Sequence, residues 1–213
     1  MTDATAPQGA EMTLHWSPRS PFVRKVMVFA HEVGLADRLT LIRTVVAMTK
    51  PNHDLMPVNP LSKIPTLELA DGTVLYDSAV ICEYLDTLHD GPRRIPAEGP
   101  ARWVELRRHA MLTGFLDLLI LWRNERDKPQ PLPVLLEAFQ VKANFALAAI
   151  EAEVEAIGAG PVGLSQVTMG VVGAYLDFRF PDIDWRTACP RFAAWHKAFS
   201  ARPSMLATLV SEG

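Results

Sequence analysis

The sequence predicts a chain of two parts, a small α/β domain followed by an all-helical domain. Short strand-like segments alternate with helical patterns up to residue 89, and the apolar patterns from residue 101 onwards have helical spacing. Between them, residues 90–100 read DGPRRIPAEGP, a proline- and glycine-rich composition typical of a linker. The predicted parts are therefore a loose leader over 1–11, an α/β domain over 12–89, the linker over 90–100 and a helical domain over 101–213.

The composition excludes several classes of protein. The 213 residues are 49% hydrophobic and 21% charged, as in ordinary soluble globular proteins, and the formal net charge is −3 without any basic block. This balance argues against a nucleic-acid partner and against an anionic membrane surface. The longest charge-free run, 156–176, contains a proline and five glycines, so it does not predict a membrane span.

The sequence also predicts a cytoplasmic protein without a bound metal. Residues 1–11 have neither a basic segment nor an apolar one, so they do not read as a signal peptide. Two cysteines, Cys82 and Cys189, cannot build a disulfide framework, which indicates a reducing compartment. The six histidines lie far apart and show no zinc-binding spacing, so we expect no metal site.

The α/β domain begins with a strand candidate at residues 12–16 and a well-marked helix. The helix has Ser20 as its N-cap, Pro21 at its first position and Gly34 just past its last apolar residue. Its apolar stripe consists of Phe22, Val23, Val26, Met27, Ala30 and Val33, and its other face carries Arg24, Lys25 and Glu32.

A second strand, a hairpin and another helix complete this domain. Residues 39–46 form the strand, and residues 66–69 and 73–76 flank Asp71-Gly72, a dipeptide typical of hairpin turns. Asp77 then caps the last helix. The order is β-α-β-x-β-β-α, in which x is a stretch that the patterns leave unassigned. After the linker, residues 101–127 and 134–157 carry helical apolar spacing, and shorter helices follow, broken at Pro181, Pro190 and Pro203.

The first segment with chemical interest is Ser17-Pro18-Arg19-Ser20, which closes the first strand and opens the first helix. Backbone amides and the dipole at a helix N-terminus favour an anion such as a thiolate. Ser20 is accounted for as the N-cap. Ser17 lies three residues earlier, is not needed for capping, and is therefore the candidate for chemistry.

The second segment, residues 59–66, reads as a loop that enters the third strand. Pro65 cannot donate a hydrogen bond to a sheet, so it belongs at a strand start or edge. A cis Ile64–Pro65 bond would expose the backbone groups of Ile64 to a peptide-like ligand. An ordinary trans proline at a strand edge is the alternative.

The third segment is Tyr76-Asp77-Ser78. An acid and a hydroxyl at a helix start can bind the end of an amino acid, because the carboxylate takes the ammonium and the hydroxyl with free amides takes the α-carboxylate. The alternative is a helix cap without a ligand.

Together the three segments resemble the soluble glutathione S-transferases. SPRSPFVRKV, NPLSKIPTLELADG and YDSAVICEYLD occur in that family's order and separation, and GAYLDFRFPDIDW and RPSM are similar to its bacterial members. The resemblance covers nearly the whole chain from Met12. It implies a thioredoxin-like N-terminal domain of order β-α-β-α-β-β-α, an all-α C-terminal domain, glutathione as cosubstrate without a permanently bound cofactor, and a homodimer.

The resemblance also implies roles for individual residues. Ser17 matches the serine of the family's serine-type classes, Pro65 its cis-proline, and Asp77-Ser78 the pair that binds the γ-glutamyl group. We expect the Ile64 backbone to pair with the cysteinyl unit and Lys63 to neutralise the glycyl carboxylate, although Lys63 could equally be a solvated lysine.

These assignments predict a glutathione transferase that serves detoxification. Ser17 would stabilise the glutathione thiolate, which adds to a small electrophile; a serine cannot form a mixed disulfide, which excludes disulfide exchange. The alternatives are a non-catalytic glutathione-binding protein and a glutathione-dependent isomerase or dehalogenase. Candidates for the electrophile pocket are Arg19, Met111, Phe115, Leu119 and Arg123, of which the last four, spaced four apart, could instead belong to the helical core.

One helix start departs from the family's common capping box, Ser/Thr-x-x-Asp. Here the stretch reads Ser165-Gln-Val-Thr168, so threonine replaces the acid that reaches back to the cap amide. This departure questions the stability of the helix start rather than the chemistry.

Overall fold

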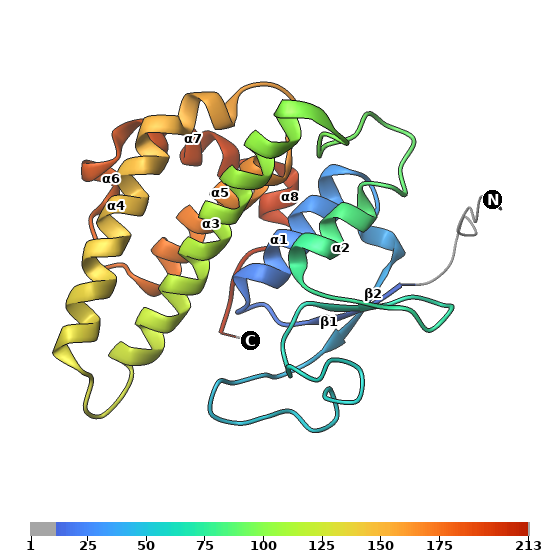
Figure 1. The fold of residues 1–213 in the computed structure, drawn as a ribbon, viewed down its shortest axis with the longest axis horizontal. Coiled ribbons are helices and arrows are strands. Elements are labelled where there is room, and N and C mark those ends of the chain that lie inside the picture. Colours follow the sequence, from blue (N-terminus) through green and yellow to red (C-terminus); the bar gives the residue numbers. More distant parts are fainter. Residues whose placement is uncertain (1–11, 213) are drawn as a thin grey trace. The chain divides into compact units, whose positions relative to one another are not determined.

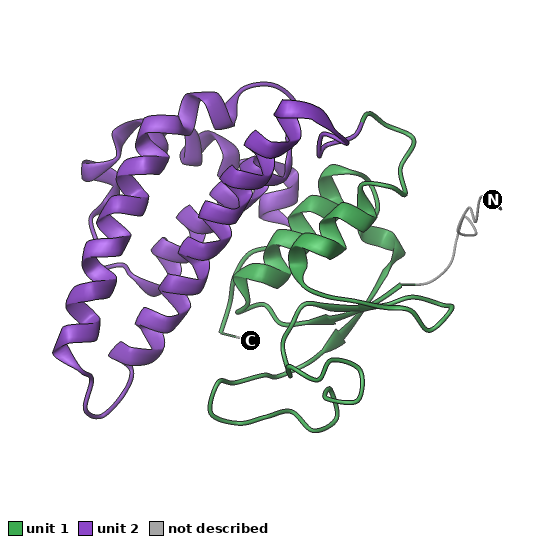
Figure 2. Cartoon of the chain, viewed as in Figure 1, with its two compact units in different colours: residues 1–92, 208–213 green, residues 93–207 purple. Residues whose placement is uncertain are grey.

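The computed structural model of the protein describes residues 12–212, which divide into two units (Figure 2). The first unit contains residues 12–92 together with 208–212, and the second contains residues 93–207. The leader predicted over 1–11 lies outside the described residues. The last residues were expected in the helical domain, but they join the first unit, where Arg19 Nε donates to the Glu212 carbonyl oxygen over 2.5 Å and Arg24 Nε to Thr208 Oγ1 over 3.5 Å.

A mixed sheet of four strands forms the first unit, in the order β2-β1-β3-β4 (Figure 1). The strands are β1 (Met12–Trp16), β2 (Leu39–Arg43), β3 (Thr66–Glu68) and β4 (Val74–Leu75). β1 runs parallel to β2 and antiparallel to β3, and β4 is antiparallel to β3. The predicted hairpin is confirmed: Gly72 has a φ of 85°, which favours glycine, and Asp71 Oδ1 accepts from Thr73 N over 2.8 Å. This is a thioredoxin-like fold.

Two α-helices of the first unit, α1 (Pro21–Glu32) and α2 (Ser78–Leu85), lie on the same face of the sheet (Figure 1). The predicted N-cap of α1 is confirmed, because the Ser20 hydroxyl accepts from Val23 N over 3.3 Å. A short 3-10 turn, η1 (Ala36–Arg38), connects α1 to β2. Arg24 and Lys25, placed by the sequence on the face opposite the apolar stripe, are buried. Arg24 Nε donates to Thr208 Oγ1, and burial lowers the pKa of Arg24 to about 10.

The family resemblance implies a helix between β2 and β3, and this prediction is wrong. Residues 44–65, all of them described, contain turns and no helix. The physical reason is the distribution of prolines at 51, 57, 60 and 65, since each lacks a backbone N–H and disrupts a preceding helical turn. Asn52 organises a local turn in their place, because its Oδ1 accepts from Asp54 N and Leu55 N over 3.0 Å.

The second unit is helical, as predicted. Its helices are α3 (Gly99–Arg126), α4 (Pro133–Gly158), α5 (Leu164–Arg179), α6 (Trp185–Ala188), α7 (Pro190–Ser200) and α8 (Pro203–Leu206). Pro190 and Pro203 occupy first helical positions, where a missing N–H costs nothing. Most of α5 is buried, so it forms the core around which α3, α4 and α7 pack (Figure 1).

Close packing of α5 against α7 depends on glycine. A Cβ atom on Gly170 would lie 2.5 Å from the ring of Phe199, and one on Gly173 would overlap the imidazole of His196. His196 Nε2 is also hydrogen-bonded to the Gly170 carbonyl oxygen over 3.1 Å. The two helices therefore approach at a distance that only glycine permits.

The start of α5 is stabilised from outside its own sequence. Its N-cap is Gly163 rather than Ser165, and no side chain of the cap position binds the helix. Instead, Glu105 of α3 accepts a hydrogen bond from Ser165 N over 2.7 Å, and the Ser165 hydroxyl donates to the Glu105 carbonyl over 3.2 Å. Thr168 Oγ1 donates to the Leu164 carbonyl over 2.7 Å. The acid missing from position 168 is thus replaced by an acid on another helix.

Among the described residues, α4 alone is long and apolar enough to cross a membrane, with a mean hydropathy of 1.3 in its most apolar window. Only 17% of that window is buried. Length and composition alone are weak evidence for a membrane span. In this structure α4 packs on α3, where Arg107 and Arg108 both bind Glu153 of α4. The exposed side of α4 carries Val134, Val141 and Phe145.

Candidate functional site

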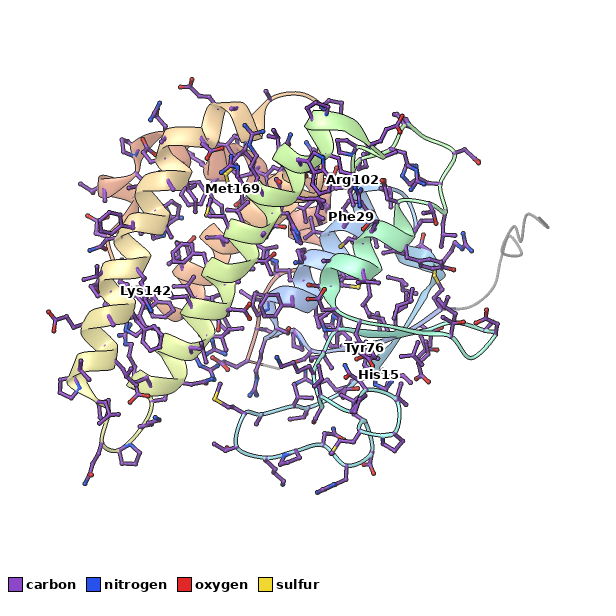
Figure 3. The ribbon with its side chains drawn as sticks, in the orientation of Figure 1. His15, Phe29, Tyr76, Arg102, Lys142 and Met169 are labelled. Carbon is purple, nitrogen blue, oxygen red and sulfur yellow. The ribbon has the colours of Figure 1, made fainter. Side chains whose placement is uncertain are left out.

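The register of the sheet brings the three chemically interesting segments to one end. β1 and β2 are parallel, so both end there, at Trp16 and Arg43. Thr66 pairs with His15, and Leu75 pairs with Leu67, so β3 begins and β4 ends at the same place. Figure 3 labels His15 and Tyr76 in this part of the first unit. The residues that follow β1, β2 and β4 and those that precede β3 therefore share one end of the sheet.

Ser17 directly follows β1 and is 9% exposed. Its hydroxyl oxygen accepts from Arg43 Nη1 over 3.1 Å and, more weakly, from the Arg19 backbone N over 3.5 Å. Both partners are donors, and the Ser17 hydroxyl donates to no group within residues 12–212. The proton of this nearly buried hydroxyl is therefore available to a ligand.

The Ile64–Pro65 bond is cis, which excludes the trans alternative. The backbone N–H and C=O of Ile64 make no hydrogen bond with any other described residue. Buried Asn59 stabilises the backbone on both sides of this bond. Its Nδ2 donates to the Lys63 carbonyl over 3.1 Å and to Thr66 Oγ1 over 2.8 Å. The Ile64 backbone can thus pair with an extended ligand. Lys63 is exposed beside it.

Asp77 caps α2 as predicted: its Oδ1 accepts from Ala79 N over 2.9 Å. The other carboxylate oxygen has no partner among residues 12–212, and the side chain is exposed. Ser78 is buried directly beside it, at the first position of the helix. The peptide bond between Tyr76 and Asp77 is also cis. One Asp77 oxygen can therefore receive a ligand ammonium while the other caps the helix.

The electrophile-pocket candidates are distributed over both units. Arg19 belongs to the first unit, where it binds Glu212. On α3, Phe115 is 3% exposed and Leu119 is 0% exposed, so both lie in the interior of the chain. Met111 and Arg123 are half-buried, and Arg123 Nη2 donates to Asn124 Oδ1 over 2.6 Å. Solvent therefore reaches only Met111 and Arg123 of the four α3 candidates to an appreciable extent.

Burial disfavours the thiolate form of both cysteines. Both are buried, and burial raises the pKa of Cys82 to about 12 and also raises that of Cys189. A thiolate at the sheet end would therefore have to come from a bound ligand.

Two residues of this site escape sequence reasoning. The sequence places Arg43 only within a predicted strand, and its contact with Ser17 depends on the pairing of Trp16 with Arg43. Asn59 could be suspected only because it precedes Pro60 at the start of the loop, where a polar side chain often replaces missing backbone bonds.

Comparisons with known proteins identify relatives of this chain. The family model described as glutathione S-transferase, N-terminal domain, matches residues 19–88. A glutathione transferase family member from Pseudomonas fluorescens Pf-5 is 41% identical, and the match covers 94% of this chain and 100% of that one. Its structure with bound glutathione has a TM-score of 0.91, and its structure with bound S-(propanoic acid)-glutathione one of 0.87.

A second relative is an uncharacterised GST-like protein, YibF, from Escherichia coli K12. It is 25% identical over 203 residues, which are 92% of this chain and 98% of that protein. These similarities extend over both units of the chain.

Proposed function

Because the chain belongs to the glutathione S-transferase family, we propose that it binds glutathione at the end of the sheet and transfers it to a small electrophile. The observation that carries this proposal is the Ser17 hydroxyl, whose oxygen accepts two hydrogen bonds and whose proton has no acceptor in the described residues. A hydroxyl in this state is a donor for a sulfur anion.

Contacts to all three parts of glutathione would hold it. The Ile64 backbone, unpaired among the described residues, takes the cysteinyl unit as an added strand. Asp77 takes the γ-glutamyl ammonium, and Ser78 with the first amides of α2 takes its α-carboxylate. Lys63, exposed beside Ile64, takes the glycyl carboxylate. This arrangement brings the cysteinyl sulfur towards Ser17 at the end of β1.

The chemical step then depends on ionising the thiol. A thiol with a pKa of about 8.5 is only a few per cent ionised at neutral pH. Lowering this pKa by roughly two units requires about 2.7 kcal/mol, which one charge-assisted hydrogen bond and a helix N-terminus can supply. Ionisation gains about thirty-fold at most, so positioning of the electrophile supplies the rest of the acceleration.

The relative's ligand suggests where to look for the electrophile. S-(propanoic acid)-glutathione carries a short carboxylic acid on the glutathione sulfur. We therefore infer that unsaturated and halogenated three-carbon acids are the first electrophiles to screen. Arg19 in the first unit and Arg123 on α3 are the cationic candidates, and either could bind such a carboxylate. Half-buried Met111 is the candidate for contact with its apolar part, whereas Phe115 and Leu119 are buried.

We further propose that the protein is cytoplasmic, forms a homodimer and serves detoxification. The support for a dimer is the exposed apolar side of α4, on which Phe145 is 76% exposed and Val134 and Val141 are exposed. We propose that the α/β unit of a second copy covers this side of α4.

The decisive test replaces Ser17 by alanine. The apparent pKa of bound glutathione should rise towards its free value, and the catalytic rate at neutral pH should fall roughly ten-fold or more. Affinity should change little, because the other contacts remain. Ultraviolet thiolate absorbance against pH gives the pKa, and calorimetry gives the affinity. A wild-type protein that binds glutathione but converts no electrophile would be the binding protein instead, and isomerisation or halide release in the screen would identify those reactions.

A further inference from the structure

We propose that Arg43 is a positioning residue that makes the Ser17 hydroxyl a hydrogen-bond donor to the glutathione thiolate. The inference rests on the proposed function, because it concerns the same thiol. It goes beyond that function in assigning a role to a residue at the end of β2, outside the segments that carry the resemblance.

The sheet fixes the position of Arg43. It is the last residue of β2 and pairs with Trp16, the residue before Ser17, in the parallel ladder. Its guanidinium lies 5.7 Å from the centre of the Trp16 ring and donates to Ser17 Oγ over 3.1 Å. The aromatic face and the hydroxyl together hold the end of an otherwise flexible side chain.

The chemistry follows from what a guanidinium cannot do. It has five N–H donors, no acceptor and a permanent charge, so it can neither take the serine proton nor turn into an acceptor. Arg43 therefore engages one lone pair of the Ser17 oxygen over 3.1 Å, and the Arg19 backbone N approaches the other more weakly over 3.5 Å. The O–H of Ser17 is left to point at the ligand.

This arrangement distinguishes thiolate from thiol. A free serine hydroxyl could accept from the S–H of glutathione, which would stabilise the neutral thiol and raise its pKa. With Arg43 donating to the Ser17 oxygen, the hydroxyl is oriented to donate to sulfur, which stabilises the anion. Arg43 also makes no ion pair with a described carboxylate, so its charge is retained at the site. The positive charge polarises the hydroxyl and strengthens it as a donor.

The test uses the full chain with Arg43→Met, Arg43→Lys, Ser17→Ala and the double variant Ser17→Ala/Arg43→Met. The thiolate absorbance of bound glutathione is titrated in each, and calorimetry measures glutathione affinity. Arg43→Met should raise the apparent pKa of the bound thiol by about one unit and lower kcat at pH 7 roughly three-fold, which is the loss of thiolate that this shift produces. Glutathione affinity should fall only about three-fold at pH 7, which is the loss that the pKa shift itself produces, since the other binding contacts remain. Arg43→Lys, which keeps a charged donor, should leave the pKa of the bound thiol close to its value in the wild type.

The double variant separates action through Ser17 from a direct effect of charge on sulfur. If Arg43 acts through the hydroxyl, its replacement adds little to the pKa shift of Ser17→Ala. Lys50→Met is the matched control, because it removes a positive charge from the segment that follows β2, and Lys50 makes no hydrogen bond to Ser17. It should leave the titration unchanged.

The outcomes divide cleanly. An Arg43→Met shift that persists undiminished in the Ser17→Ala background, or that Lys50→Met reproduces, overturns the positioning role. If Ser17→Ala shifts the thiol pKa while Arg43→Met does not, the inference about Arg43 fails and the proposed function stands. If Ser17→Ala leaves the titration unchanged, the serine mechanism itself is wrong, and the role of Arg43 falls with it.

Discussion

The two carboxylate oxygens of Asp77 differ in their contacts at the start of α2. One carboxylate oxygen accepts from Ala79 N and caps the helix, while the other has no partner among the described residues. Asparagine keeps the capping oxygen and removes the charge, so it tests the ligand contact without disturbing the helix. Alanine would remove both.

We therefore predict that Asp77→Asn weakens glutathione binding roughly ten-fold while the thermal midpoint changes little. A charged hydrogen bond contributes about 1.5–3 kcal/mol, and the exposure of Asp77 places the effect at the lower end of that range. Calorimetry measures the affinity. Unchanged affinity in this variant would remove Asp77 from the binding site.

Among individual residues, the sequence predicts some members of the candidate site and not others. Ser17, Pro65 and Asp77 adjoin local signals, a helix start or a strand start, that a linear pattern displays. The role of Arg43 depends on the pairing of two strands, and the burial of Lys25 depends on packing that no helical periodicity reveals. The contacts of such residues form only when segments that are distant in the sequence come together in the fold.

Among the helices, α5 depends on its neighbour for its first turn. The acceptor for Ser165 N is Glu105 of α3, and Ser165 itself is buried. Glu105→Ala would leave a buried amide without a partner, which costs about 1–3 kcal/mol. We predict a lower urea midpoint for this variant. Glu137→Ala, on the exposed side of α4, is the control and should unfold like the wild type. Equal midpoints for the two variants would contradict the interhelical cap.

A pair of glycine variants tests the approach of α5 to α7. Gly170→Ala places a methyl group 2.5 Å from the ring of Phe199 and should destabilise the protein by about 1–3 kcal/mol through overpacking. Gly114→Ala, in α3, meets nothing within 4 Å and should stabilise it by about 0.5–1 kcal/mol. Denaturant unfolding measures both. A neutral Gly170→Ala would show that the helices can separate without cost.

The elements themselves show how far periodicity predicts a fold. Both long helices and the hairpin were predicted within a few residues, because their caps and turn residues are local. The segment between β2 and β3 was assigned a helix only by analogy, and its own prolines prevent one. In this segment the effect of the prolines on the backbone outweighs the resemblance to the family.

On the scale of the whole molecule, the exposed side of α4 predicts association. Light scattering at micromolar concentration should give about twice the sequence mass of 23.6 kDa. Phe145→Asp places a charge in the apolar patch and should shift the protein towards the monomer. Leu206→Asp, at an exposed apolar position of α8, should not. A wild-type mass near 23.6 kDa would refute the dimer.

Residues 208–212 make the helical unit an insertion. The polypeptide leaves the first unit at residue 92 and re-enters it at residue 208, where Thr208 contacts Arg24 and Glu212 contacts Arg19. A gene fragment for 93–207 therefore encodes the helical unit without interruption, whereas no uninterrupted fragment encodes the other unit alone. Isolating that unit requires a spliced gene in which a short designed connection joins residue 92 to residue 208.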